Sequence, residues 1–469
     1  MIHRLLPYSG LKRLYGASPG WVRELYAAIP FAWRAGSAFR RTSRVIRRTE
    51  QLPWPELRAL QGERLRELLQ HAHDHVPFYR EAMREIGFDP ARALLPGDLA
   101  RLPLVSKSML QDQPERFQAE AGVGEPVYAD NTGGSSGTPF GFLKPNSMYP
   151  IEQAYMLAQW RRVGYEPTDR KLTLRGRVFT GGRQRWAYNP IYRELVLSSY
   201  HLDADTVTAA LIEARRFKPR FMHGYPSAIT RFLQVAVEAG LQPPTGIRAV
   251  LCGSEPLYEF QRQFIRETLG CRVYSWYGQS ECVLLAGECE HSTAYHSFPL
   301  YGVLELVDEV GGVITEPDVE GEIVGTALHN RAMPFIRYRT GDRGVYDAPG
   351  PCACGRSYPR LRTVTGRKQE FIYTSGERAV PVTAFVFGQH FDAFERIRGM
   401  QLVQDRPGEL RVHLLTRGGY DSTDEEEIRR KMEASVDHDL HVRFQYVDQL
   451  ALNAAGKTPF VIQRWAPKA

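Results

Sequence analysis

The spacing of apolar residues predicts a mostly helical segment over residues 51–125. Its leucines recur at helical intervals, as on the buried face of an amphipathic helix. Two prolines precede them and suit the first turn of a helix, where a missing N–H costs little. These residues are Pro53, Pro55, Leu57, Leu60, Leu65, Leu68 and Leu69.

Between residues 151 and 277, helical and strand-like patterns alternate. Strands separated by helices of ten or more residues predict parallel pairing with crossover connections. Ligands bind such sheets beyond the carboxyl ends of the strands, where Gly253–Pro256 and Tyr277–Glu281 lie. The predicted helices cover 151–163, 204–217, 228–239 and 256–269, and the predicted strands cover 171–178, 221–225, 249–252 and 272–277.

From Tyr301 onward the pattern becomes that of hairpins, and the last hundred residues resemble a separate α+β unit. That unit has a predicted helix over 423–435, which opens with acidic residues near its N-terminus. The predicted strands of this half are 303–307, 321–328, 335–338, 400–404, 410–415 and 442–447. The fold class predicted is therefore α/β, with a large multi-layer N-terminal domain of mixed sheets and helices and a small α+β C-terminal domain. The expected domains are a basic, mostly helical extension (1–50), an N-terminal domain (51–366) and a small mobile C-terminal domain (367–469).

Composition agrees with a soluble globular protein. The chain has 469 residues, 43% of them hydrophobic and 24% charged. No apolar run reaches the ~18 residues needed to span a bilayer, and the N-terminus lacks the order of a signal peptide. We therefore expect a cytoplasmic protein.

The net charge of +7 is concentrated at the N-terminus. Residues 1–50 contain ten Lys and Arg but only Glu24 and Glu50, a net of +8. Interleaved aromatic residues such as Trp21 and Trp33 would suit contact with an anionic membrane surface or an acidic partner. A helical extension with a solvated basic face explains the charge equally and is the interpretation we favour. We expect no nucleic-acid partner, because no recognition motif accompanies the charge.

The segment 131–139, Asn-Thr-Gly-Gly-Ser-Ser-Gly-Thr-Pro, holds three glycines and four hydroxyl side chains. Glycine lets the backbone approach a ligand closely, and N–H and O–H groups can surround phosphate oxygens. The segment is not the P-loop of nucleoside triphosphatases, because the nearest lysine, Lys144, follows Gly137 by seven residues. The sequence thus predicts a phosphate cradle, with a flexible surface loop as the alternative.

Six cysteines in a chain of this length argue against a disulfide framework. Cys352 and Cys354 stand one residue apart, and Cys289 is followed by His291 and His296. Two pairs of soft ligands from separate hairpins could close a tetrahedral structural Zn²⁺ site. The alternative is a set of buried free thiols.

Four signatures occur together in the order and approximate spacing of the adenylate-forming enzymes, which include acyl-CoA synthetases. They are the cradle, Tyr277–Glu281, Tyr338–Asp342 and Asn453–Lys457. Within that superfamily the chain most resembles the phenylacetate-CoA ligase and CapK-like branch. This closer resemblance rests on the amino-acid sequence of the cradle and on three further segments, Gly224–Ser227, Gly253–Pro256 and Cys352–Arg356.

The resemblance implies a role for each signature. Tyr277 would stack on adenine, Asp342 would bind both ribose hydroxyls, and Glu281 would hold Mg²⁺. Lys457, carried by the mobile C-terminal domain, would be the catalytic cation. The implied metal ligands are Cys289, His296, Cys352 and Cys354, with His296 favoured over His291. The implied ATP-binding residues are Thr132, Gly133, Gly134, Ser135, Ser136, Gly137, Thr138, Gly253, Ser254, Glu255, Pro256, Tyr277, Gly278, Gln279, Ser280, Asp342 and Arg367.

The resulting hypothesis is an ATP-dependent, AMP-forming ligase that activates a small carboxylic acid as an acyl-adenylate and transfers it to CoA. One alternative is a CapK-like amide-forming ligase or nucleotidyl transferase with an amine or other acceptor. A second alternative is a catalytically silent nucleotide-binding scaffold, against which Lys457 and Asp342 argue. We expect the pocket for the acid to be lined by residues from the region Lys171–Tyr225 and from around Gly278–Leu284.

Overall fold

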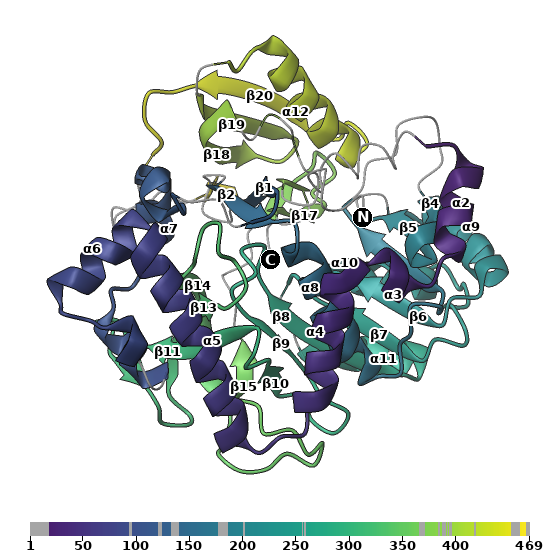
Figure 1. The fold of residues 1–469 in the computed structure, drawn as a ribbon. Coiled ribbons are helices and arrows are strands. Elements are labelled where there is room, and N and C mark those ends of the chain that lie inside the picture. The colour runs from purple at the N-terminus through teal and green to yellow at the C-terminus, as the bar shows by residue number, and fades with distance from the viewer. Residues whose placement is uncertain are drawn as a thin grey trace.

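The computed structural model places two sheet-centred units in one molecule (Figure 1). The larger contains a 13-stranded sheet and the smaller, at the top of Figure 1, a four-stranded sheet with one long helix. The predicted α/β class with a small C-terminal α+β unit is confirmed. The structure describes residues 18–92, 96–120, 124–132, 140–176, 186–199, 202–255, 257, 259–364, 371–382, 385–386, 391, 393, 396–416, 419–451 and 460–465.

Helices form the first part of the described chain. The long helix α5 starts after Pro53 and turns Leu57, Leu65 and Leu68 into the core, as the leucine spacing predicted. The preceding helix α4 packs on α8 through Phe39 and Ile46. The helices are α2 (Gly20–Ala28), α3 (Phe31–Arg34), α4 (Gly36–Thr49), α5 (Trp54–His75), α6 (Pro77–Glu85) and α7 (Lys107–Asp112).

The predicted alternation of strands and helices builds the parallel part of the large sheet. Strand β3 lies between β5 and β6, and β6, β7 and β8 follow in parallel order. All four residues of β6 and of β7 are buried, as expected for strands covered on both faces by helices. The elements are β3 (Lys171–Arg175), β4 (Trp186–Asn189), β5 (Glu194–Ser198), β6 (Phe221–Gly224), β7 (Ala249–Cys252), β8 (Arg272–Gly278), α8 (Met148–Arg161), α9 (Ala204–Phe217), α10 (Pro226–Glu238) and α11 (Glu259–Leu269).

Antiparallel strands extend the sheet beyond β8. Their order is β9, β10, β15, β14, β13, β11 and β12, so the segment after Tyr301 forms hairpins as predicted. The bounds are β9 (Leu285–Gly287), β10 (Tyr295–Ser297), β11 (Gly302–Val307), β12 (Val313–Ile314), β13 (Glu320–Ala327), β14 (Tyr338–Tyr346) and β15 (Arg360–Val364).

One predicted strand, 335–338, is wrong. Phe335 and Ile336 are buried in the connection between β13 and β14, and the strand starts only at Tyr338. Arg337 has a φ of 48°, which interrupts extended backbone, and its buried guanidinium lies 3.1 Å from Glu305. An apolar loop that belongs to the core therefore had the local pattern of a strand.

The C-terminal unit is a sheet with strand order β20-β19-β18-β21. Helix α12 covers it and buries Ile428 and Met432, and Asp421 and Asp424 close its N-terminus with a capping box. The elements are β18 (Ile397–Arg406), β19 (Glu409–Thr416), α12 (Ser422–Ser435), β20 (His441–Tyr446) and β21 (Val461–Gln463).

Two further hairpins complete the described fold. Strands β1 (Val127–Thr132) and β2 (Phe140–Pro145) pair antiparallel, with Thr132 opposite Phe140, so they lead into and out of the predicted cradle. Strands β16 (Phe371–Tyr373) and β17 (Ala379–Pro381) pair in the same manner. Over the described residues, none of the helices combines the length and the hydropathy that crossing a membrane requires.

Candidate functional site

Two predicted ATP-binding side chains from strands of the large sheet, Tyr277 and Asp342, meet in the structure. Tyr277, next to the end of β8, donates its hydroxyl to Oδ2 of Asp342 in β14 at 2.9 Å. The same hydroxyl lies 3.4 Å from Oγ1 of Thr340, which in turn accepts the backbone N–H of Asp342 at 3.1 Å. Burial and the adjacent Asp342 carboxylate raise the pKa of Tyr277 well above its usual value. These contacts fix the orientation of the Asp342 carboxylate.

Glu281 lies in the turn that follows β8. Its side chain is buried, and Oε1 accepts the hydroxyl of Tyr338 at 2.9 Å. The turn is closed by a hydrogen bond from the backbone N–H of Cys282 to the carbonyl of Gln279. Because Tyr338 begins the strand that carries Asp342, the structure brings the predicted metal carboxylate and the predicted ribose carboxylate to the same pair of elements.

Gly253, Ser254 and Glu255, which the resemblance implies bind ATP, directly follow β7. Gly253 packs against the indole of Trp276, and a Cβ at this position would lie 2.3 Å from the ring, so only glycine fits. The next residue, Ser254, has a φ of 66° and is exposed, so the backbone takes a left-handed conformation two residues after the end of β7. Glu255 is partly buried beside it.

A charge pair between a buried lysine and a partly exposed aspartate supports the hairpin that leads into and out of the predicted cradle. Nζ of Lys144 in β2 lies 2.7 Å from Oδ2 of Asp130 in β1, and the lysine side chain is only 5% exposed. Burial opposes the charge on Lys144, but Cys282, Asp130 and Glu152 outweigh it and raise its pKa. The pair therefore ties together the two strands that flank residues 133–139.

The same pair lies beside the turn of Glu281. Cys282 approaches Oε2 of Glu152 in α8 at 3.4 Å, and burial raises the pKa of both groups, that of Cys282 to about 12. Lys144 is the lysine that the sequence singled out only as too distant for a P-loop. Its contact with Asp130 depends on strand register, which the sequence pattern did not predict for this hairpin.

The expected acid-binding region contains buried polar groups. Lys171 of β3 lies 3.3 Å from Glu194 of β5, and both side chains are less than a tenth exposed. A guanidinium nitrogen of Arg175 lies 3.5 Å from Nδ1 of His223, where burial and Arg175 hold the histidine pKa well below its usual value. Lys171 and Glu194 begin their strands, whereas Arg175 and His223 lie at the carboxyl ends of β3 and β6, within the region where the sequence predicts the acid.

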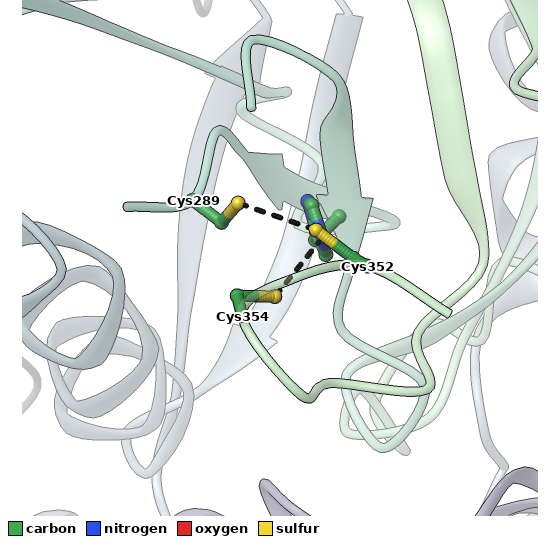
Figure 2. A group of neighbouring side chains, drawn as sticks. Cys289, Cys352 and Cys354 are labelled. Carbon is green, nitrogen blue, oxygen red and sulfur yellow. Dashed lines mark hydrogen bonds between the residues drawn. The ribbon is translucent and has the colours of Figure 1, made fainter. Parts of the chain in front are cut away.

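The four predicted metal ligands form one cluster. The ligand atoms of Cys289, His296, Cys352 and Cys354 all lie within 4.8 Å of one another. The Sγ atoms of Cys289 and Cys352 are 3.6 Å apart, and Sγ of Cys354 is 3.4 Å from Nε2 of His296. Figure 2 shows Cys289 on one segment of the chain facing Cys352 and Cys354, which lie together on another. His291 is not part of this cluster.

Neighbouring groups orient the cluster. Nδ1 of His296 lies 3.0 Å from the carbonyl of Ala294, which leaves Nε2 facing the thiols. Burial lowers the pKa of His296 to about 4, so the imidazole is neutral and able to ligate near neutral pH. Burial opposes ionisation of Cys354, but hydrogen bonds from Arg356 outweigh it and lower the thiol pKa.

Arg356 joins the cluster to the N-terminal helices. Its guanidinium lies 2.7 Å from Glu50, just beyond α4, and 2.6 Å from Glu290. Gly355 adopts a φ of 78°, and a Cβ there would lie 2.6 Å from the side chain of Gln51. The loop of Cys352 and Cys354 is therefore packed against the connection between α4 and α5.

Several predicted residues lie outside the described residues or are described only by backbone. The predicted catalytic lysine, Lys457, falls outside the described part, together with Arg367, Pro256 and the cradle residues 133–138. Thr132 is described as the end of β1, without its side chain. Gly278 ends β8, and Gln279 and Ser280 lead from it to Glu281.

Two protein-family models match the chain. The model described as "AMP-binding enzyme" matches residues 60–326, and the model described as "CapK C-terminal domain" matches residues 374–464. The first spans more than half of the chain and includes Tyr277, Glu281 and the four strands β6 to β9.

Relatives and solved structures agree with these matches. The chain is 28% identical to the phenylacetate-coenzyme A ligase of Thermus thermophilus over 345 residues, which are 71% of this chain and 75% of the relative. It is 19% identical to protein CapK of Staphylococcus aureus, with 87% and 89% covered. A crystal structure of 2-hydroxyisobutyryl-CoA ligase in the thioesterification state shares the fold, with a TM-score of 0.59 and 20% identity over 89% of this chain and 91% of that one.

Proposed function

The chain belongs to the AMP-binding enzyme family, and from this premise we propose that it joins a carboxylic acid to CoA through an acyl-adenylate. ATP supplies the adenylyl group, and pyrophosphate and then AMP leave. The observation that carries the proposal is the hydrogen bond between Tyr277 and Asp342, close to the buried Glu281. The similarity to phenylacetate-coenzyme A ligases supports the choice of CoA as acceptor.

The site residues divide the work of positioning ATP. Asp342, held by Tyr277, accepts hydrogen bonds from the ribose hydroxyls, and the aromatic ring of Tyr277 lies against adenine. The cradle between β1 and β2 surrounds the β- and γ-phosphates with N–H and O–H donors, while Lys144 and Asp130 brace its two strands. In-line transfer depends mainly on such positioning and on charge neutralisation.

Negative charge on the phosphates during adenylyl transfer must be neutralised by cations. Glu281 would hold Mg²⁺, a cation that prefers oxygen ligands and would neutralise phosphate charge when bound. Lys457 contributes a flexible ammonium that reaches the carboxylate and α-phosphate oxygens. The C-terminal unit that follows residue 366 in the chain delivers this lysine and then moves to admit the acceptor.

A structural zinc is the second part of the proposal. Tetrahedral Zn²⁺ with Zn–S bonds of about 2.3 Å and Zn–N bonds of about 2.0–2.1 Å would place its ligand atoms about 3.8 Å (S···S) and 3.6 Å (S···N) apart. The measured separations are 3.6 Å between Cys289 and Cys352 and 3.4 Å between Cys354 and His296. Four protein ligands leave no open position, so the metal would hold the two segments together and take no part in the reaction.

The acid can be identified without knowing the acceptor. ATP–pyrophosphate exchange over a library of carboxylic acids should show exchange with one class of acid. Asp342→Ala should abolish that exchange at limiting ATP, and Asp205→Ala, which changes an exposed aspartate of α9, should not. The absence of exchange with every acid, in protein that still binds ATP, would favour the silent scaffold.

A second acceptor class follows from the match to CapK. Both the C-terminal model and the relative that covers 87% of this chain carry that name. If the acceptor is an amine, purified acyl-adenylate will be consumed when an amine is added and will be stable towards CoA. Rapid thioester formation with CoA would instead support the primary proposal.

A further inference from the structure

The first two described helices are only partly packed: Phe31 and Ala32 of α3 lie against the core beside Phe39, and α2 lies against residues 190–192. Neither α2 nor α3 contains a buried residue. Of the fourteen large apolar side chains that are exposed in the described chain, five lie within residues 21–33: Trp21, Leu25, Tyr26, Ile29 and Trp33. Clusters of this kind mark surfaces that bind something apolar.

Two of the exposed residues follow helical geometry. Trp21 and Leu25 are four residues apart, so they project from one side of α2. Ile29 follows the last residue of α2 in extended backbone, and Trp33 lies in α3. Trp21 is 67% exposed and Trp33 is 73% exposed. A nine-residue helix is marginal in water by itself, because few hydrogen bonds repay its nucleation. Covering this apolar side would stabilise α2.

Basic charge lies on the next helix. α4 buries Phe39 and Ile46 against α8 and exposes arginines on its other faces. The exposed arginines are Arg40, Arg41, Arg44, Arg47 and Arg48. Of the two acids in residues 18–50, Glu50 is already paired with Arg356 at 2.7 Å. The exposed part of α4 is therefore uniformly positive.

A solvated basic extension, the interpretation that the sequence favoured, explains the arginines and the packing of α4. It does not explain two tryptophans in water on the preceding helices. Binding to an anionic lipid surface needs two components, apolar side chains such as tryptophan and basic side chains such as arginine. Helices α2 and α3 supply the first and α4 supplies the second. Tryptophan in particular prefers the headgroup level of a bilayer.

We propose that α2, α3 and α4 dock the protein on a membrane surface that carries anionic lipid headgroups. The apolar side chains of α2 and α3 enter the headgroup region, and the arginines of α4 contact the lipid phosphates. A fluid bilayer accepts side chains spread over three helices, whereas a protein partner needs a shaped pocket for each anchoring residue. Figure 1 shows α2 at the outer edge of the molecule near β4, where Tyr188 is also exposed.

The test is co-sedimentation of the full-length protein with vesicles. Binding is expected with vesicles that contain phosphatidylglycerol, weaker binding at high salt, and little binding to pure phosphatidylcholine. The apolar variant Trp21→Ser/Leu25→Ser/Trp33→Ser and the charge variant Arg41→Glu/Arg44→Glu/Arg48→Glu should each reduce partitioning by at least about tenfold.

Matched controls locate the effect. Ile212→Ser/Val237→Ser changes exposed apolar residues of α9 and α10, and Arg92→Glu changes an exposed arginine elsewhere. Both should bind vesicles like the wild type, and all variants should retain the wild-type melting temperature within a few degrees. Because vesicle binding needs neither ATP nor an acid, its result is independent of the proposed enzymatic function.

Three results would overturn the proposal. Absence of binding to anionic vesicles would exclude it directly. Equal binding by the apolar variant would place the contact elsewhere. Light scattering that shows a wild-type dimer and a monomeric apolar variant would mean that the apolar side is covered by a second copy of this chain.

Discussion

Removing one cysteine from the Cys289–His296–Cys352–Cys354 cluster should cost the protein its zinc and several kilocalories of stability. Two of the separations, Cys289–Cys352 and Cys354–His296, lie within a few tenths of an ångström of tetrahedral values, and all four ligand atoms lie within 4.8 Å of one another, so only a local rearrangement opposes binding. At free zinc about 1,000-fold above its dissociation constant, the bound metal would add about 4 kcal/mol to the free energy of unfolding. At about 2 °C per kcal/mol for a large domain, its loss should lower the melting temperature by about 8 °C.

The assay combines metal analysis with thermal unfolding. Wild-type protein purified without chelator should carry about one zinc per chain and lose stability when chelator is added. Cys354→Ser should carry little zinc, melt lower and respond little to chelator. Cys271→Ser is the matched control, because Cys271 is a partly buried free cysteine outside the cluster.

The loss should extend to the N-terminal helices. Arg356 follows Cys354 in the same loop and holds Glu50 just beyond α4, so hydrogen exchange of α4 should quicken in Cys354→Ser. A metal-free wild-type protein, or a Cys354→Ser variant with full zinc and an unchanged melting temperature, would refute the zinc assignment.

Three further predictions concern the reaction and the core. Asp342→Ala should raise the KM for ATP about 100-fold, since it removes charge-assisted hydrogen bonds to ribose. Glu281→Ala should raise the KM and also lower kcat, and initial rates at varied ATP concentration separate the two effects. Wild-type kinetics in either variant would remove that residue from the site. Lys457→Ala should slow adenylate formation by about 10²–10³-fold but still transfer a presynthesised acyl-adenylate; equal loss in both half-reactions, with folding intact, would contradict this role. Burial lowers the pKa of His329 to about 3 in the folded protein. The unfolded chain therefore binds more protons below about pH 6.5, and folded stability should fall by about 1.4 kcal/mol per pH unit from there towards pH 3. Urea unfolding of the wild type and His329→Gln at pH 7 and pH 5 should show about 2 kcal/mol less pH dependence in the variant, and identical pH dependence would show that His329 does not contribute it.

Local patterns predicted most elements because burial leaves a periodic trace in the chain. Strand Ala249–Cys252 and helix Ala204–Phe217 occur where the sequence placed them. The first is a short, fully apolar strand between helices, and the second starts after Asp203, whose side chain accepts the N–H of Thr206 as an N-cap.

The hydrophobic pattern gave a wrong prediction at residues 335–338, where an apolar run is buried in the core but forms no regular strand. Phe335 and Ile336 fill the core from a connection, because the residue after them takes positive φ to pair its guanidinium with Glu305. That partner lies 32 residues away in the chain. No local window contains the cause of the break in the strand.

The sequence by itself supplied the chemistry of the candidate site: a carboxylate at 281, another at 342, an aromatic at 277 and four candidate metal-ligating side chains. Motif order and spacing were sufficient for that, since each motif is a short contiguous segment. Tertiary structure decided which of these groups meet. Tyr277 and Asp342 are 65 residues apart, and Cys354 and His296 are 58 apart, so their contacts exist only because β8, β10, β14 and the loop before β15 converge around the sheet. The exposed apolar side of α2 is likewise a property of the folded molecule, because burial is decided by which neighbours the completed fold supplies.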